Sequence, residues 1–221
     1  MSGSVEETQI KFKVIFLTLL FFRLTFVFPC DLPDHFDFSV ANNDRTLYSG
    51  CYDAIHKGPH IVEYILIKER VQAPSVRRPD VQFTQNRDGG VLQKLLKEHG
   101  YSLPRYSDYT RSGYDRGHMA PNGDFNDNYE DAVLTFFIAN VWPQLPSVNR
   151  SEWVKTENET RKLAVQYLAV KVVIIVDEFT DRKVADIQVP SVFKKKVYEV
   201  SSGEVSDKPI YEVEVYQRVE E

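Results

Sequence analysis

Residues 114–124 read Tyr-Asp-Arg-Gly-His-Met-Ala-Pro-Asn-Gly-Asp. This segment brings Asp115, Arg116 and His118 within four positions, with Gly117 between them to let the backbone bend. A histidine accepts a proton near neutral pH, an arginine offers a planar fork to phosphate oxygens, and a nearby carboxylate can orient either side chain. The same quartet also fits a surface turn with a salt bridge and a solvated histidine, so the sequence that follows decides between the two interpretations.

Further polar residues follow downstream at spacings that favour a site. Asn140 precedes Val-Trp-Pro-Gln, and Asn149 stands just before a predicted helix. Trp153, Glu157 and Arg161 are four positions apart and therefore share one face of that helix. A helix N-terminus is electropositive and suits phosphate. An ordinary amphipathic helix with a solvated Glu–Arg pair is the alternative interpretation of this segment alone.

Taken together, these residues resemble the DNA/RNA non-specific endonucleases with a ββα-metal active site. The resemblance rests on the Asp-Arg-Gly-His quartet at 115–118, on Asn140 with the Pro-Gln pair at 143–144, and on the helix residues above. The Ser-Gly-Tyr before the quartet and the Met-Ala-Pro after it also look like bacterial members. The likeness is good over residues 108–163, fainter over 30–108 and loose beyond 176.

The resemblance implies roles for the base and the metal. His118 would be the general base that deprotonates water, and Asn149 would be the protein ligand of a hydrated Mg²⁺, which Mn²⁺ could replace. Glu157 would hold metal-bound water. Asn140 would position the ligand region, and Asp115 would brace the motif. A hydrated octahedral Mg²⁺ needs few protein ligands, so this set is chemically sufficient.

The resemblance also implies that arginines stabilise the transition state. Arg116 and Arg161 would neutralise the charge that develops on the phosphate. A further arginine of the family, upstream of the motif, would be Arg77 or Arg78. Because such contacts read no base edge, the expected substrates are both DNA and RNA, cut without regard for sequence or sugar. A homodimer and an inhibitor protein stay open as partners.

Two departures from the family pattern bear on these expectations. Thr156 stands where the family usually has an apolar residue, and Asp-Glu-Phe at 177–179 replaces a turn that tends to contain glycine. The alternative from another functional class is a catalytically weak relative that binds nucleic acid or a protein. The complete set of His118, Asn149, Glu157 and Arg161 disfavours it, because a binding module need not keep all four.

Composition indicates one globular domain. The chain has 221 residues, 43% hydrophobic and 27% charged, with a net charge of −5. The acidic balance argues against tight binding of nucleic acid over a broad surface, but catalysis needs only a local cluster and a metal ion. Strands and helices mix without regular alternation, which predicts an α+β fold with a mainly antiparallel central sheet flanked by helices.

The pattern along the chain predicts the main elements. Residues 31–43 are rich in turn formers, and residues 141–148 hold two prolines and are predicted to be irregular. Helices are expected at 90–99, ending at Gly100, and at 151–170. Strands are expected at 47–52, 60–68, 132–139, 171–176, 184–189 and 210–216.

The N-terminus predicts export. A short apolar run, interrupted by Arg23, follows basic residues, so residues 1–28 resemble a signal peptide and residues 29–221 the nuclease domain. The alternative is that this segment is an uncleaved membrane anchor. The anchored protein would then be either an exported nuclease or an intracellular or mitochondrial one. Cys30 and Cys51 follow the apolar run, and export would favour a disulfide between them over two free thiols.

Overall fold

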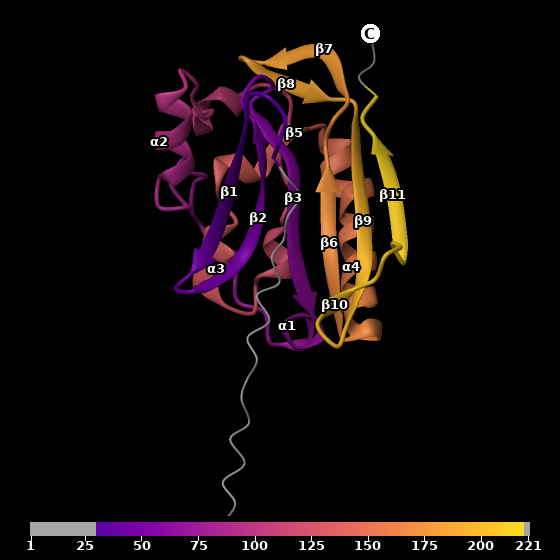
Figure 1. Ribbon diagram of the computed structural model, residues 1–221. Coiled ribbons are helices and arrows are strands. Elements are labelled where there is room, and N and C mark those ends of the chain that lie inside the picture. The colour runs from indigo at the N-terminus through magenta and orange to yellow at the C-terminus, as the bar shows by residue number, and fades with distance from the viewer. Residues whose placement is uncertain (1–29, 219–221) are drawn as a thin grey trace, which may run out of the picture.

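The computed structural model describes residues 30–218, and its main feature is one curled antiparallel sheet (Figure 1). The sheet runs in the order β1-β2-β3-β6-β9-β10, and β11 pairs with β9 as well. Every pairing in it is antiparallel. Its strands are β1 (His35–Asn42), β2 (Arg45–Asp53), β3 (Gly58–Ile67), β6 (Ala169–Ile175), β9 (Val192–Ser201), β10 (Glu204–Val205) and β11 (Tyr211–Tyr216). The α+β fold with a mainly antiparallel sheet is therefore confirmed.

One face of the sheet is buried beneath the helices. Side chains alternate along a strand, so Val62, Tyr64 and Leu66 of β3 point to the same side, and all three are buried. Tyr64 lies opposite Val172 of β6, which lies opposite Val197 of β9 in turn. These β-branched and aromatic residues suit a strand and fill the core between sheet and helices.

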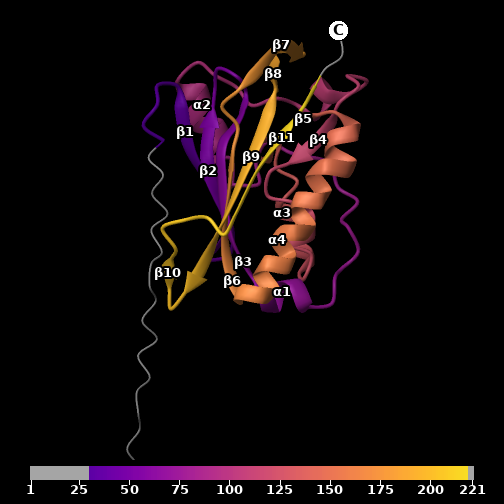
Figure 2. The ribbon, with the colours of Figure 1, turned by 90° about the vertical axis from the view of Figure 1, so that its right-hand side faces the viewer.

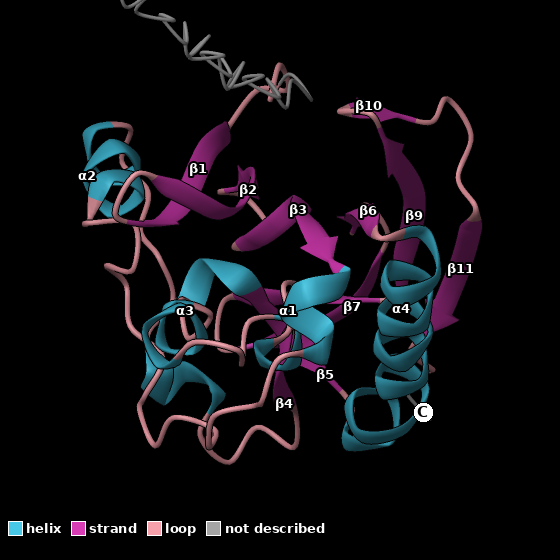
Figure 3. Cartoon of the chain, turned by 90° about the horizontal axis from the view of Figure 1, so that it is seen from below, coloured by secondary structure: helices cyan, strands magenta, loops and turns pink. Residues whose placement is uncertain are grey.

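The helices gather on that buried side. They are α1 (Lys68–Gln72), α2 (Val91–Glu98), α3 (Tyr129–Leu134) and α4 (Trp153–Tyr167). Figure 2 shows α4 lying along the sheet, and Figure 3 shows α3, α1 and α4 on one side of it, whereas α2 lies beside β1. The predicted helix at 90–99 is confirmed, with Gly100 just beyond it at a φ of 82°. The predicted helix at 151–170 is α4.

Two short strand pairs complete the architecture. β4 (Asp115–His118) pairs with β5 (Val141–Gln144), and β7 (Phe179–Val184) pairs with β8 (Ile187–Pro190). Viewed as in Figure 3, the β4–β5 pair lies on the helical side of the sheet, between α3 and α4. The pair thus carries the Asp-Arg-Gly-His quartet to the N-terminal end of α4.

Three predictions about local structure are wrong. Residues 132–139 do not form a strand, because Asn128 accepts a hydrogen bond from the Asp131 backbone and so begins a helix, α3, that extends to Leu134. Residues 141–144 are a strand despite Pro143, which is tolerated because β5 pairs with a single partner. Residues 35–42, within a segment expected to consist of turns, form β1. The strand expected at 184–189 is part of the β7–β8 hairpin.

Cys30 and Cys51 form a disulfide that ties the start of the described chain to β2. The segment predicted to be a signal peptide or anchor, residues 1–28, lies outside the described residues. Within residues 30–218, no helix has the length and apolar character needed to cross a membrane.

Candidate active site

The β4–β5 pair fixes the quartet against a rigid neighbour. Gly117 lies opposite Trp142, and Asp115 lies opposite Gln144. A Cβ atom on Gly117 would overlap the side-chain amide of Gln144, which is fully buried. Glycine is required here for this close approach, and its φ is not in the left-handed region.

His118 ends β4 in a largely apolar setting. Its ring lies 4.9 Å from the Phe83 ring and 5.4 Å from the Phe136 ring, between centroids. Its carbonyl accepts a 3.0 Å hydrogen bond from Trp153 Nε1, which joins β4 to α4. Its Nε2 has no hydrogen-bond partner among the described residues. Burial, followed by the positive charge of Arg78, lowers the pKa of His118 to about 3, so the imidazole is neutral at physiological pH.

Asn140 fixes the chain just after His118. Its side-chain oxygen accepts from the Ala120 backbone at 2.9 Å, and its Nδ2 donates to the carbonyl of Ala120 at 2.9 Å and of Thr135 at 3.0 Å. Its own carbonyl accepts from Met119 at 2.9 Å. Asn140 is fully buried, and it therefore holds the backbone of the motif.

Asn149 lies in a π-helical turn, Val148–Glu152, directly before α4. Such turns often occur at functional sites. Its Nδ2 donates to Asp115 Oδ2 at 2.9 Å, and no described residue is recorded as donating to its side-chain oxygen. Arg150 grips the same carboxylate with two hydrogen bonds of 2.8 and 2.7 Å. The hydrogen bonds from Arg150, with that from Asn149, hold the pKa of Asp115 below its usual range.

Glu157 and Arg161 of α4 are half-buried and form a charge cluster with Asp124, which is buried in the loop after β4. Arg161 Nε donates to Asp124 Oδ1 at 2.7 Å, and its Nη2 lies 3.5 Å from Glu157 Oε2. Asp124 also accepts a 2.7 Å hydrogen bond from the Tyr64 hydroxyl. Burial raises the pKa of Glu157. The Arg161 guanidinium lies against the backbone of Gly123, which lines the cavity, so the charge cluster borders the site.

A cavity of about 330 Å³ unites these elements. It is lined by Arg78, Arg116, His118, Pro121, Asn122, Gly123, Asn149, Arg150, Val154 and Glu157. The histidine from β4, the amide from the π-helical turn and the carboxylate from α4 thus face one space. Asn140, Asp115 and Arg161 are not among its lining residues. Asp115 bonds to Asn149 and Arg150, and Arg161 bonds to Glu157, whereas Asn140 bonds to the backbone just after His118.

The arginines around the cavity differ in how they are held. Arg78, rather than Arg77, lines the cavity, and its guanidinium lies 5.2 Å from the centre of the Phe136 ring. Arg116 donates to the Tyr106 carbonyl at 2.8 Å and stacks 3.8 Å from the centre of that residue's ring. Arg116 is therefore fixed beside the cavity before any substrate arrives.

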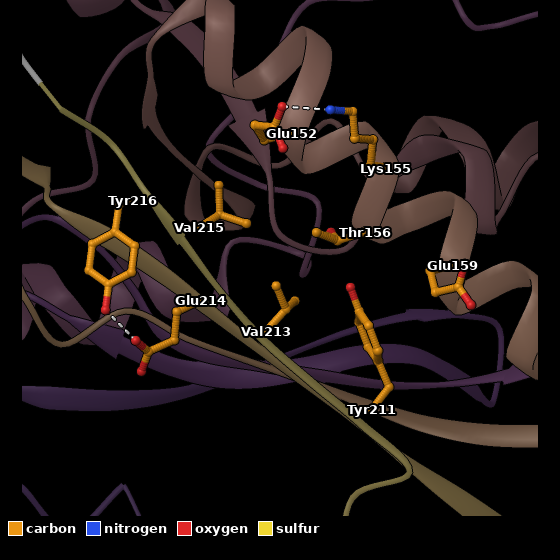
Figure 4. A pocket seen from close by; sticks show the side chains of 9 residues that line it. All are labelled: Glu152, Lys155, Thr156, Glu159, Tyr211, Val213, Glu214, Val215 and Tyr216. Atoms are coloured by element: carbon orange, nitrogen blue, oxygen red, sulfur yellow. Dashed lines mark hydrogen bonds and ion pairs between the residues drawn. The ribbon is translucent and has the colours of Figure 1, made fainter.

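A second, larger hollow of about 480 Å³ lies between α4 and β11 (Figure 4). It is lined by Glu152, Lys155, Thr156, Glu159 and Tyr211, and by Val213 to Tyr216 of β11. No histidine or arginine lines it, in contrast to the smaller cavity, which His118, Arg78 and Arg116 line.

The donor set suits a hydrated magnesium ion. Within residues 30–218, no group of three or more histidine, cysteine, aspartate or glutamate side chains could hold a metal alone. The cavity instead offers the amide oxygen of Asn149, oriented by Asp115, with Glu157 on the same wall. Hard oxygen ligands with room for water fit Mg²⁺, which keeps several waters in proteins. A metal that demands a closed protein cage would not fit here.

Several site residues escape sequence reasoning. Arg150 carried no signal beyond its charge, and Phe83 lies far from the motif in the sequence. Asp124 ends the quoted motif, yet its ion pair with Arg161 depends on how the loop folds.

Comparison with known proteins agrees with this geometry. The profile of the DNA/RNA non-specific endonuclease family matches residues 33–213, and the chain belongs to that family. It is 32% identical to human mitochondrial endonuclease G over 128 residues, which are 58% of this chain and 40% of that protein. It is 45% identical to a nuclease of Nostoc sp. over 58 residues, 26% of this chain and 21% of that protein.

A solved structure supports the same assignment. The chain superposes with a TM-score of 0.56 and 28% identity on a chain of a crystal structure of the EndoG/EndoGI complex. The match covers 70% of this chain and 66% of the other. The chain spans less than half the length of the human and Nostoc proteins that it matches.

Proposed function

We propose that this protein is a metal-dependent endonuclease that hydrolyses phosphodiester bonds in both DNA and RNA. One observation carries the proposal: a neutral histidine with a partner-free Nε2 and an oriented asparagine amide face the same cavity. Family membership supports the nuclease class. The relatives are named nucleases. Because the match spans only part of their length, the nuclease activity of this chain is a proposal.

His118 is proposed to take a proton from the attacking water at Nε2, which needs no prior deprotonation because the ring is neutral. Asn149 would hold a Mg²⁺ ion, or Mn²⁺ in its place, and Glu157 would order water beside it. When bound, this ion would polarise the phosphate and stabilise the leaving oxygen. The cations Arg78 and Arg116 would stabilise charge that develops on the phosphate.

Arg161 is proposed to act from the cavity's edge, by adding positive charge and by holding Glu157 in place. Contacts of this kind reach phosphate and carry no sequence information. The proposed cleavage is therefore blind to sequence and to the sugar.

The deciding experiment is digestion of plasmid DNA and of RNA by purified protein, with Mg²⁺ and with chelator. His118→Ala is expected to lose about a hundred- to ten-thousandfold of the rate, the usual contribution of a general base. His99→Ala, an exposed histidine beyond α2, is the matched control and should keep full activity. If the wild type binds DNA but cuts neither substrate in any divalent metal, the protein is a binding relative and the proposal fails.

We also propose that the chain is exported. The Cys30–Cys51 disulfide supports this, because such bonds persist in oxidising compartments. The human relative is named mitochondrial, so a mitochondrial location is the alternative outcome of the localisation experiment.

A further inference from the structure

Lys195 is a buried cation that the proposed chemistry does not use. It lies in β9 between Phe193 and Val197, and alternation along the strand turns all three toward α4. Its neighbours Lys194 and Lys196 turn to the other face and form ion pairs there. Lys195 is fully buried, which is rare for a lysine and costly unless the charge is compensated.

The two partners of the Lys195 ammonium lie on α4. Its Nζ donates to Thr156 Oγ1 at 2.8 Å and lies 4.2 Å from the centre of the Trp153 ring. No carboxylate of residues 30–218 is recorded within ion-pair distance of it. Thr156 is one of the two departures from the family pattern, and its hydroxyl supplies the acceptor that this buried ammonium needs. The lysine and the threonine therefore form one unit.

The neighbouring charges leave Glu157 short of a counter-charge. Asp124 has a direct ion pair with Arg161 at 2.7 Å, whereas Glu157 lies 3.5 Å from the same guanidinium. Trp153, Thr156 and Glu157 share one face of α4, so the ammonium that contacts the first two lies beside the third. The other charged groups near Lys195 are Arg161 of α4 and Asp124 in the loop after β4, which accepts from the Tyr64 hydroxyl of β3. Burial lowers the pKa of Lys195 to about 8, and Glu157 is the main group that opposes this.

We infer that Lys195, held by Thr156, is a positioning residue that supplies the second positive charge for Glu157 and keeps that carboxylate ionised in the cavity wall. Two carboxylates, Asp124 and Glu157, are thereby matched by two cations, Arg161 and Lys195. Burial raises the pKa of Glu157, and Lys195 is the charge that most strongly lowers it. The role of Glu157 in ordering water rests on the proposed function, but its coupling to Lys195 does not.

The first test measures this coupling without any activity. In metal-free protein, the carboxyl carbon of Glu157 is titrated by NMR in the wild type and in Lys195→Met. The midpoint should rise by about one pH unit in the variant, as expected for the loss of a nearby opposite charge. In the control Lys194→Met, which removes a lysine from the other face of β9, the midpoint should match the wild type. An unchanged midpoint in Lys195→Met overturns the inference.

A reciprocal variant guards against misfolding of Lys195→Met. Glu157→Gln keeps the shape of the side chain, and the ammonium of Lys195 should then titrate below its wild-type value of about 8. An unshifted lysine in this variant would show that the two groups are independent and would also reject the inference.

Activity provides the second test. Lys195→Met should lower kcat about tenfold with little change in KM, as removal of a supporting group often does. In a Glu157→Gln background the same change should have no further effect, because Lys195 acts through Glu157. Equal losses in both backgrounds would mean a merely structural lysine. A wild type that cleaves nothing would reject the nuclease proposal, while the titrations would still judge the coupling.

Discussion

Asp115 shows how one carboxylate organises two neighbouring side chains. It accepts one hydrogen bond from Asn149 and two from Arg150, while β4 holds its backbone opposite Gln144. The asparagine amide is thereby turned so that its oxygen is left for a ligand. Arg150 balances the negative charge of Asp115 beside the cavity that is proposed to hold phosphate and a metal ion.

Asp115→Asn should weaken the proposed binding of Mg²⁺ more than it lowers the free energy of unfolding. The neutral side chain cannot accept the paired hydrogen bonds of Arg150 as an anion does, and Asn149 loses a charge-assisted partner. We expect the Mg²⁺ concentration for half-maximal activity to rise about ten- to a hundredfold. Asp80→Asn, at an exposed position, is the control. An Asp115→Asn enzyme with unchanged Mg²⁺ dependence would contradict the proposed orienting role.

The pKa of Asp115 gives this variant a pH signature. Because the folded-state pKa lies below the unfolded one, the stabilisation is present above the unfolded pKa of about 3.9 and is lost as pH falls through the folded pKa. The difference in unfolding free energy between wild type and Asp115→Asn should therefore be full near pH 6 and shrink below pH 4.

Much of the site could be predicted at the residue scale, because the chemistry of a short motif is visible in its residue types. His118, Asn149 and Glu157 line the cavity, and Asp115 contacts Asn149, as the family resemblance implied. Arg150 and Lys195 could not be assigned in the same way. Their partners are 35 and 39 positions away, and only the folded chain brings them together.

The β4–β5 pair is the element on which the site depends most. It is short, and it holds its shape through side-chain packing as well as through its ladder. Gly117 and Gln144 meet where no Cβ atom fits, and Trp153 of α4 bonds the carbonyl of His118. A shift of this strand pair would displace His118 directly, because His118 ends β4.

Gly117→Ala is therefore expected to damage the site through packing. The added methyl group would overlap Gln144, at a cost of about 1–3 kcal/mol for overpacking a buried position, and should lower kcat at temperatures where the variant is still folded. Denaturant unfolding and cleavage rates check the two effects. Gly203→Ala, where the space is open and φ is +83°, is the comparison: it should lose some stability through backbone strain but keep its activity. Equal activity in the two variants would argue against a packing constraint at Gly117.

The wrong element predictions have a common physical cause. An apolar run of eight residues does not distinguish a buried strand from a short helix. The helical conformation at the start of 132–139 follows from the cap at Asn128, which lies outside that run. Pro143 is compatible with β5 only because β5 pairs with β4 on one side and with no described strand on the other. Both outcomes depend on neighbours that lie elsewhere in the chain.

At the scale of the whole molecule, the sheet could be predicted only in part. β3, β6 and β11 follow from their β-branched residues, but β9 did not stand out, because three consecutive lysines at 194–196 interrupt its apolar pattern. In the fold this strand pairs with both β6 and β11. Lys194 and Lys196 are accommodated by acidic partners on the exposed face, and a sequence alone does not place those partners.

The Cys30–Cys51 disulfide should stabilise the first part of the sheet. On the chain-entropy model, a loop of this length contributes about 3 kcal/mol, and reduction should lower the unfolding free energy by up to that amount with little effect on cleavage. Non-reducing peptide mapping of protein recovered from its native compartment should find the two residues bridged. Free thiols in exported protein would contradict the disulfide, and finding the protein in a reducing compartment would contradict the proposal of export.

Gln217 lies beyond the residues that match the family and is nevertheless part of the folded unit. Its side chain accepts from the Leu145 backbone at 2.6 Å and donates to the carbonyls of Pro143 at 3.1 Å and Pro190 at 2.9 Å. The family match stops at residue 213, so a recombinant fragment cut at that boundary would keep every proposed catalytic group. It would nevertheless lose Gln217 and its hydrogen bonds to Pro143 of β5 and to Leu145 just after that strand. The borders of a domain drawn from sequence similarity are thus not always the borders within which its active site can assemble.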